Sequence, residues 1–565
     1  MKQNTHKKVL LASLPYWTPQ IPPLAMSLLK TQLRRQGFDV TVVDLNVEEE
    51  FHHLEQEYFN TMKTYIPPEL RGNFYNVGND VLRNHLMFHW NAPQRDISLD
   101  LLRISIEVNF FVNMPDQGLR ELDLLAGRFY RLLEDYFTSL LEREKPDVLG
   151  LSVFSGNFGP SLFTFRMARE KFPRIMTVMG GGVFADQLSP GSPNYDMFMK
   201  QVDYIDKIIV GEGEVLLSKL LSGELPADQR VFLFQDFEEG PLALSAIGLP
   251  DYSDLYLDRY PYMASFASRS CPFQCSFCSE TVQWGKYRKK DPGRIAGELL
   301  ELSGKHQNQL FLMGDSLLNP VVNGLSQALI DKGGGVYWDG YIRADKEVCN
   351  LDNTILWRRG GYYRARLGME SGSQRVLKLM GKKITPAQIK EALSSLAHAG
   401  IKTTSYWVIG HPGETESDFQ QTLDLIAEMK NEIYEAECNP FNFYMAGQVV
   451  SDQWVESNRP RMLYPEEAWE YLILQTWFLD GEPSRFEMHD RVRRFVDFCR
   501  RMGIPNPYSF QDIRAADERW TKLHKNAVPP MMEFKKGQPV NDDPTGVKKL
   551  SMVKNTLKDD DEWNF

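Results

Sequence analysis

Three of the six cysteines in this 565-residue chain lie within eight residues, at Cys271, Cys275 and Cys278. Thiolates grouped in one loop are the usual ligands of iron–sulfur clusters and also bind zinc. A structural zinc site needs a fourth ligand, and the next histidine, His306, lies 28 residues beyond Cys278. The spacing therefore favours an iron–sulfur cluster with three protein ligands, which leaves one iron free to bind another molecule. A zinc site is the alternative.

Polar and glycine-containing phrases end several apolar runs further along the chain. They contain Gly314, Asp315 and Ser316 after one run, Arg343 at the end of the next, Glu370 and Ser371 after a third, and Ile409 and Gly410 after a fourth. Active sites of barrel enzymes lie at the carboxyl ends of parallel strands, which is where these phrases fall. His411, directly after Gly410, is interpreted as a turn residue.

Six apolar runs, most of them separated by helical patterns, would position these residues. They span 262–270, 309–314, 335–343, 362–370, 402–410 and 435–444. Alternating strand and helix patterns predict parallel strands, here a partial (β/α)6 barrel over residues 261–445. A C-terminal helical region is expected over 446–540. Residues 541–565 are charged and poor in core formers, so we expect a disordered tail.

A second α/β unit precedes the barrel. Short apolar runs alternate with amphipathic stretches over residues 1–225, which predicts a doubly wound, Rossmann-like sheet. A helical insertion interrupts it at about 48–144, and the proline-containing residues 226–260 are interpreted as a linker. The insertion and the C-terminal region belong to neither core fold, so they are candidates for covering a substrate site. Trp454, Trp469 and Trp477 of the C-terminal region are interpreted first as helical core, and lining of a pocket for a peptide or planar metabolite is the alternative.

The cysteine spacing, with Phe277 before the last cysteine, resembles the signature of radical S-adenosylmethionine (SAM) enzymes. The phrases after the later runs also follow in the order of that family, over about residues 260–445. The resemblance implies a 4Fe–4S cluster held by the three cysteines, with SAM on its free iron and reductive cleavage to a 5′-deoxyadenosyl radical. It further implies SAM contacts from Phe277, Gly314, Asp315, Ser316, Arg343, Glu370, Ser371, Ile409 and Gly410.

The N-terminal unit resembles the cobalamin-binding domain of cobalamin-dependent radical SAM enzymes. The resemblance implies cobalamin contacts from Tyr16, Trp17, Ser152, Gly180, Gly181, Gly182, Gly211, Glu212 and Gly213. The chain departs from many such domains, because none of its ten histidines stands in an Asp-x-His-x-x-Gly motif that would ligate cobalt. Cobalamin is therefore expected to bind without a histidine ligand from the chain. A cobalamin-type fold that has lost its cofactor is the alternative.

Together the two resemblances imply a cobalamin-dependent radical SAM enzyme. The first expectation is methyl transfer, through the 5′-deoxyadenosyl radical and methylcobalamin, to an unactivated carbon or phosphorus of a peptide or small metabolite. The alternatives are rearrangement, ring contraction or oxidative cyclisation without methyl transfer, and a non-catalytic cobalamin or cluster sensor. An electron donor such as flavodoxin or ferredoxin is also implied.

Composition limits the remaining classes of protein. Acidic residues outnumber basic ones by 75 to 64, a formal charge of −11, which argues against a broad nucleic-acid-binding surface. No window approaches the ~18 apolar residues of a membrane span, and the first apolar run is too short for a secretory signal. We expect a cytoplasmic protein in which Cys349, Cys438 and Cys499 are ordinary apolar residues.

Overall fold

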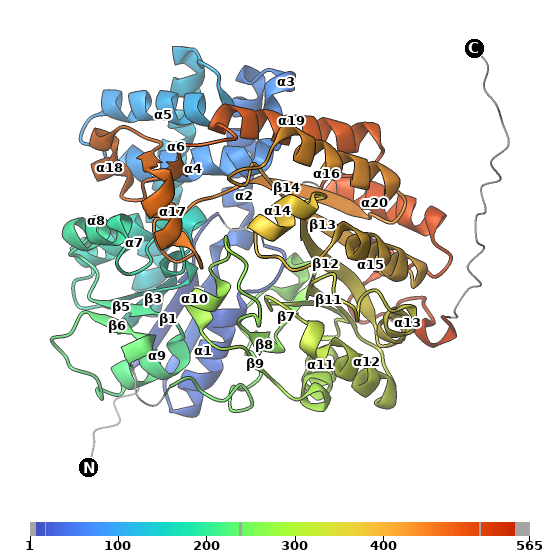
Figure 1. Cartoon of the computed structure of the whole chain (residues 1–565). Helices are drawn as coiled ribbons and strands as arrows, with labels where there is room; N and C mark the ends of the chain where they lie inside the picture. The colour runs from blue at the N-terminus through green and yellow to red at the C-terminus, as the bar shows by residue number, and fades with distance from the viewer. Residues whose placement is uncertain (1–6, 17–18, 237–239, 508–509, 548–565) are drawn as a thin grey trace.

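The computed structural model of the chain describes residues 7–16, 19–236, 240–507 and 510–547. Two six-stranded parallel sheets lie side by side, one from each half of the chain, and helices from two distant segments lie together at one end of them (Figure 1). None of the described helices is long and apolar enough to cross a membrane.

The N-terminal sheet is doubly wound, as the sequence predicts. Its six strands are parallel and lie in the order β2-β1-β3-β4-β5-β6. The order changes direction between β1 and β3, and open α/β sheets bind ligands at such a switch point, beyond the carboxyl ends of the strands. The strands are β1 Lys8–Ser13, β2 Asp39–Asp44, β3 Val148–Ser152, β4 Met176–Gly180, β5 Lys207–Val210 and β6 Val231–Leu233, and the helices beside them are α1 Leu24–Arg35, α7 Phe158–Lys171, α8 Pro193–Gln201 and α9 Gly213–Leu221.

The sixth strand corrects the predicted end of this unit at residue 225. β6 pairs in parallel with β5, so the sheet extends into the segment 226–260 that was expected to be a linker. A run of three apolar residues is too short for periodicity to separate it from a loop. Beyond β6 the segment packs on α1, where the fully buried Lys30 forms ion pairs with Asp251 and Asp254.

A helical insertion separates β2 from β3, as predicted for residues 48–144. Its buried side chains, among them Phe59 and Leu133, belong to the same apolar core as Leu10 and Leu149 of the sheet. The insertion is therefore part of the N-terminal core. Its helices are α2 Glu49–Tyr65, α3 Pro68–Arg71, α4 Phe74–Asn91, α5 Arg95–Phe110 and α6 Asp116–Glu144.

The second sheet is a partial barrel, which confirms the predicted class. Its parallel strands lie in the order β14-β13-β12-β11-β10-β7, so β7 and β14 are its two edges. Each predicted apolar run contains one strand of this sheet. The strands are β7 Met263–Ser265, β10 Leu310–Met313, β11 Tyr337–Ile342, β12 Tyr362–Glu370, β13 Lys402–Ile409 and β14 Glu435–Pro440, and the helices are α11 Pro292–His306, α12 Asn319–Asp331, α13 Leu351–Arg359, α14 Gln374–Leu379, α15 Pro386–His398 and α16 Glu416–Glu428.

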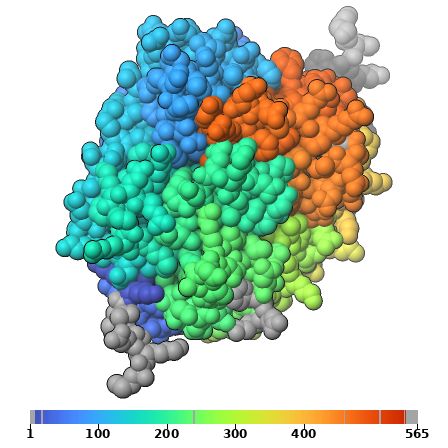
Figure 2. Space-filling model, turned by 90° about the vertical axis from the view of Figure 1, so that its left-hand side faces the viewer, coloured from blue at the N-terminus to red at the C-terminus, as the bar shows by residue number. Residues whose placement is uncertain are grey.

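The C-terminal region contacts both halves of the molecule. It is not wholly helical as predicted, because β15 and β16 form an antiparallel pair. α18 packs on α4, and Figures 1 and 2 show this region, in orange, beside the blue insertion. The elements are α17 Ser451–Asn458, β15 Pro460–Met462, α18 Glu466–Leu472, β16 Trp477–Leu479, α19 Arg485–Arg501 and α20 Phe510–Leu523.

The start of the predicted tail packs against the barrel. Arg358 of α13 donates to both carboxylate oxygens of Asp542 at 2.8 Å, and Val547 lies in the barrel core. The prediction of disorder from residue 541 is therefore wrong for 541–547. Residues 548–565 lie outside the described part of the chain.

Candidate active site

The three cysteines lie on one loop, between β8 (Ser268–Arg269) and α10 (Glu280–Trp284). Cys275 is buried, Cys271 and Cys278 are half-buried, and all three are free thiols. This segment, residues 270–279, is called the cysteine loop below. A short antiparallel pairing of β8 with β9 (Arg288–Lys289) closes its base.

The C-terminal region fixes the position of the cysteine loop. The Cys278 carbonyl accepts a hydrogen bond from the backbone N–H of Val449 at 3.1 Å. The Gln448 side chain donates to the carbonyl of Phe277 at 2.9 Å. The Phe277 side chain is half-buried beside these contacts.

The cysteine loop offers three thiols, whereas a structural zinc site takes four ligands. Burial raises the pKa of Cys271, and raises that of Cys278 to about 12, so metal binding must displace protons from these thiols. Cys271, Cys275 and Cys278 are therefore the residues that would hold a 4Fe–4S cluster.

Arg343, directly after β11, faces the cysteine loop. Its guanidinium lies 4.0 Å from the centroid of the Phe273 ring, and Nη1 is 3.8 Å from the Cys275 sulfur. Nη2 is buried and has no hydrogen-bond partner among the described residues. An unpaired buried donor is unfavourable, so this atom fits a bound carboxylate such as that of SAM.

We expect Arg343→Met to weaken SAM binding by about 10- to 100-fold, because a hydrogen bond to a charged group contributes about 1.5–3 kcal/mol. Equilibrium dialysis of anaerobically reconstituted protein against SAM measures the change. Arg143→Met is the control, since that side chain is 67% exposed. Unchanged affinity in the Arg343 variant would show that its guanidinium does not bind the carboxylate.

The phrase after β10 supports the cysteine loop at both ends. The buried Asp315 carboxylate accepts the backbone N–H of Ala267 at 2.9 and 3.0 Å, and both the N–H and the hydroxyl of Ser268. The Ser316 hydroxyl donates to Glu280 at the start of α10. Burial raises the pKa of Asp315 to about 6. Both side chains are engaged within the protein and position the loop.

The other predicted SAM contacts lie at the same end of the barrel. Glu370, with a φ of 65°, accepts a hydrogen bond from Lys382 Nζ at 2.6 Å. Ser371 and Ile409 are fully buried, so packing accounts for both side chains. Gly314 donates its N–H to a carbonyl of β7 at 2.8 Å.

Gly410 joins the end of β13 to the C-terminal helix α19. Its φ is 80°, and a Cβ there would lie 2.2 Å from Cγ of Met488. Its N–H donates to Glu414 Oε2 at 2.9 Å, and the same oxygen accepts from Arg491 Nη1 at 3.1 Å. Met488 and Arg491 both belong to α19, which explains why only glycine fits here.

Glycines at the carboxyl edge of the N-terminal sheet serve two different purposes. At Gly181, with a φ of 120°, a Cβ would lie 2.4 Å from backbone atoms of Val153, so the turn itself excludes other residues. At Gly180 it would lie an ordinary 3.5 Å from the Ile209 carbonyl oxygen, so packing alone does not require glycine beside Ser152, its partner in register. The remaining predicted cobalamin contacts at this edge are Gly182, Gly211 and Gly213, while Trp17 lies outside the described residues.

This edge fits a ligand by its place at the switch point of the sheet, but it offers no imidazole. The loops 14–20, 152–157, 180–187 and 210–214 contain no histidine. The Tyr16 hydroxyl donates to a backbone carbonyl of α2 at 3.1 Å, so this side chain is engaged with the insertion.

Glu212 joins the two halves of the molecule. Its nearly buried carboxylate pairs with Arg269 Nη1 at 2.6 Å and with Arg288, while Glu214 also pairs with Arg269. Arg269 and Arg288 lie on β8 and β9, at the base of the cysteine loop. These four residues are called the domain latch below. Sequence reasoning missed them because the partners are 55 to 76 residues apart.

A cavity of about 630 Å³ lies where the barrel, the N-terminal sheet, the insertion and the C-terminal region meet. Trp454 and Trp477 line it, as expected of the two covering segments, whereas Trp469 packs edge-on against Trp477 at 5.7 Å. Its volume is typical of a small-molecule site. Other lining residues are Gly410 and His411 of the barrel, Asp186 after β4, and Asp80 and Arg83 of α4.

His489 of α19 also lines the cavity and lies near cations. Burial, with Arg485 and Arg493, lowers its pKa to about 3. A histidine in the unfolded chain binds a proton near pH 6.5, whereas folded His489 does not, so the free energy of unfolding falls as the pH falls from about 6.5 towards 3.

Wild-type protein should therefore have a lower free energy of unfolding at pH 5 than at pH 7, and we expect His489→Gln to reduce that difference by about 2 kcal/mol. Urea unfolding at both pH values measures it, and an unchanged difference would contradict the assignment.

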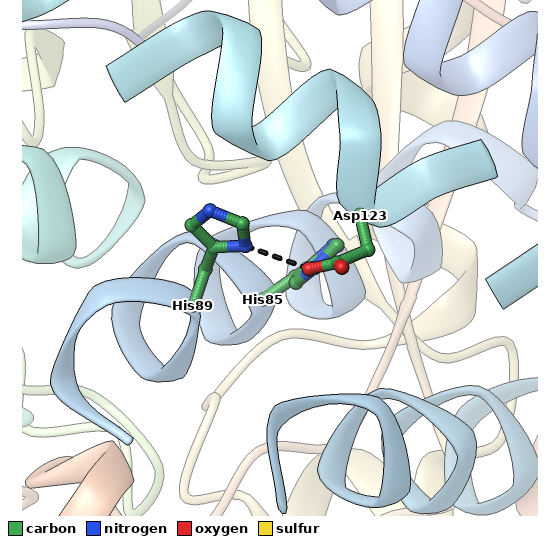
Figure 3. Close-up of side chains that lie close together, drawn as sticks. All are labelled: His85, His89 and Asp123. Carbon is green, nitrogen blue, oxygen red and sulfur yellow. Dashed lines mark hydrogen bonds and ion pairs between the residues drawn. The ribbon is translucent and has the colours of Figure 1, made fainter. Parts of the chain in front are cut away.

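A buried cluster in the insertion has the side chains of a metal site. His85 and His89 of α4 and Asp123 of α6 point toward one another (Figure 3). Asp123 accepts from His89 Nδ1 at 2.7 Å and His85 Nε2 at 3.3 Å and pairs with Arg95, while Tyr58 contacts the other His85 nitrogen at 2.8 Å. Since hydrogen bonds satisfy the carboxylate and Arg95 neutralises it, the cluster is a structural network of the insertion.

Comparison with known proteins identifies the barrel. Residues 266–426 match the model of the Radical SAM superfamily. The anaerobic magnesium-protoporphyrin IX monomethyl ester cyclase of Rubrivivax gelatinosus is 27% identical over 322 residues, which cover 52% of this chain and 56% of the relative. The cytidylyl-2-hydroxyethylphosphonate methyltransferase of Streptomyces wedmorensis is 22% identical over 406 residues, with 60% and 72% covered. The chain spans little more than half the length of the cyclases it matches.

A solved structure shares the whole architecture. The radical SAM methyltransferase TsrM from Kitasatospora setae, determined with cobalamin and a [4Fe–4S] cluster, has a TM-score of 0.58 at 13% identity, covering 92% of this chain and 99% of TsrM. The two chains therefore have the same fold, and residues 266–426 of this chain form a domain that matches the Radical SAM superfamily.

Proposed function

We propose that the chain is a cobalamin-dependent radical SAM methyltransferase acting on an unactivated carbon or phosphorus of a small molecule or peptide in the 630 Å³ cavity. The observation that carries the proposal is the make-up of the cavity wall. His411 comes from a barrel strand end, and Asp186 comes from the loop after β4 of the N-terminal sheet. A substrate in this cavity would meet both halves of the molecule at once.

The names of similar proteins support methyl transfer. TsrM is a methyltransferase whose structure holds cobalamin and a [4Fe–4S] cluster. The Streptomyces relative is named as a methyltransferase of a cytidylyl-phosphonate. The shared fold places an α/β sheet of the same kind beside the barrel in this chain.

The residues of the radical SAM site have distinct tasks in this proposal. Cys271, Cys275 and Cys278 would hold the 4Fe–4S cluster, which supplies the electron that cleaves SAM to the deoxyadenosyl radical. Arg343 Nη2 would bind the SAM carboxylate. Asp315 fixes the backbone just before the cysteine loop, so the protein's own contribution is to orient the three cysteines.

The N-terminal sheet would hold cobalamin at its carboxyl edge, beside Gly180 and Ser152, which are partners in register. Cobalamin supplies a carrier for the methyl group when bound. The chain's task at this edge is to hold the sheet against the barrel, and the ion pairs of Glu212 and Glu214 with Arg269 do so.

Anaerobically reconstituted protein loaded with hydroxocobalamin tests the proposal. With SAM and reduced flavodoxin or ferredoxin as the proposed electron donor, it should release S-adenosylhomocysteine as well as 5′-deoxyadenosine. Omission of cobalamin should abolish S-adenosylhomocysteine only. Release of deoxyadenosine alone from the loaded protein would count against methyl transfer.

The state of the bound cobalt gives a second readout. Electron paramagnetic resonance of the cob(II)alamin form should show no nitrogen splitting from an axial base, because the strand-end loops of the sheet contain no histidine. Clear nitrogen splitting would contradict this part. Failure to retain hydroxocobalamin at micromolar concentration would contradict cobalamin binding itself.

Oxidative cyclisation or another rearrangement is the second candidate. It is favoured by three cyclases of 25–29% identity among the relatives. The mass of the product separates the two reactions, since methylation adds one carbon and cyclisation adds none.

A further inference from the structure

Two buried polar atoms in the cavity wall have no partner among the described residues. They are Nε2 of His411 and Nε1 of Trp477. Charged groups of the same wall are engaged instead, since Arg83 pairs with Asp80 at 3.1 Å and Arg485 donates to two groups of α5. The two buried atoms without a partner therefore belong to an imidazole and an indole rather than to an ionised group.

The chain itself sets the tautomer of His411. Nδ1 lies 3.0 Å from the carbonyl oxygen of Pro412, so Nδ1 carries the proton and donates it, and Nε2 bears a free lone pair. The side chain is 3% exposed, and burial lowers its pKa to about 4. At neutral pH Nε2 can therefore accept a hydrogen bond but cannot donate one.

Aromatic rings surround this acceptor. Phe441 and Trp454 meet the His411 ring at steep angles, with centroids 5.3 and 6.0 Å away, and both line the cavity. Rings in such a corner favour packing against a flat, apolar group. His411 also follows Gly410 at the carboxyl end of β13, the end of a barrel at which active sites lie.

We propose that His411 is a specificity-determining residue, whose Nε2 accepts a hydrogen bond from an uncharged O–H or N–H group on an aromatic or other planar part of the substrate. A site built around a buried acceptor rejects analogues without the donor, because the acceptor then stays unpaired. The inference rests on the proposed function only in taking the occupant of the cavity to be the substrate.

Binding of a matched pair of probes to the reconstituted full chain tests this role. 4-Methylphenol carries the donor and 4-methylanisole lacks it. By equilibrium dialysis, His411→Phe should weaken 4-methylphenol binding at least fivefold and change 4-methylanisole binding less than twofold. Phenylalanine keeps a flat ring against Phe441 and Trp454 but offers no acceptor. His411→Gln, with an amide oxygen, should recover part of the lost affinity.

The matched control is Trp477→Phe, which removes the other unpartnered atom of the wall and should leave the difference between the probes unchanged. The proposal is overturned if wild-type protein binds neither probe or binds both with equal affinity. This comparison needs no variant, so it still decides the proposal if His411→Phe misfolds. Probe binding does not require SAM cleavage. Loss of S-adenosylhomocysteine formation with intact probe discrimination would therefore overturn the proposed function and leave this inference standing.

Discussion

Simultaneous replacement of Cys271, Cys275 and Cys278 by alanine is expected to leave a protein that holds no iron after anaerobic reconstitution. Wild-type protein should hold about four irons per chain. The reason is that the described cysteine loop has no other thiol to replace a lost ligand. Iron analysis and the visible absorbance of the cluster measure the loss.

The other three cysteines are the matched controls. Cys438 and Cys499 are fully buried and belong to the barrel core, and Cys349 is packed against it. Each should be replaceable by alanine without loss of iron. A triple variant of the cysteine loop that kept its iron and absorbance would place the cluster elsewhere.

The barrel could be predicted from the sequence because each of its strands leaves a local signal. A parallel strand that is buried on both faces is encoded by a short run of apolar residues. In this chain several of these runs are followed by polar phrases such as Gly314-Asp315-Ser316. These phrases lie together at one end of the barrel, but a local pattern does not give the contacts that each residue makes. Asp315 proves to hold the backbone of Ala267, a contact between residues 48 positions apart that no local pattern encodes.

Charges inside the barrel show the limit of such patterns. Asp339 of β11 is fully buried and accepts hydrogen bonds from Arg364 and Arg366 of β12 at 2.7 and 2.6 Å. The two arginines occur in a predicted strand, but a sequence does not reveal that both turn inward to one carboxylate. Burial of such a group is possible only when its partners are in place.

The cavity and the domain latch could not be predicted for the same reason. Asp186, Arg83, His411 and Trp477 come from four segments that only the folded chain brings together. β6 could not be predicted because it is a run of only three apolar residues. Such a run is too short for its periodicity to distinguish a strand from a loop.

The second large effect is expected at the domain latch. Glu212→Gln should lower the free energy of unfolding by about 3 kcal/mol, because it leaves the largely buried Arg288 without its carboxylate partner, while Arg269 keeps Glu214. The Glu212 side chain is 5% exposed, and its partners Arg269 and Arg288 are 13% and 21% exposed. Glu170→Gln is the control, since its pair with Arg166 on α7 is 63% and 52% exposed and should contribute less than about 1 kcal/mol.

Hydrogen exchange shows whether the lost stability belongs to the contact between the two halves of the molecule. If Glu212 acts through Arg288, then amides of β8 and β9 should exchange faster in Glu212→Gln than in the wild-type protein. In Arg288→Met they should exchange as fast as in Glu212→Gln. The double variant should lose less stability than the sum of the single variants, since both remove the same contact. Additive losses with unchanged exchange at β8 and β9 would mean that Glu212 stabilises only its own sheet. Because β8 leads directly into the cysteine loop, a coupled result would make the docking of the N-terminal sheet a condition for placing Cys271.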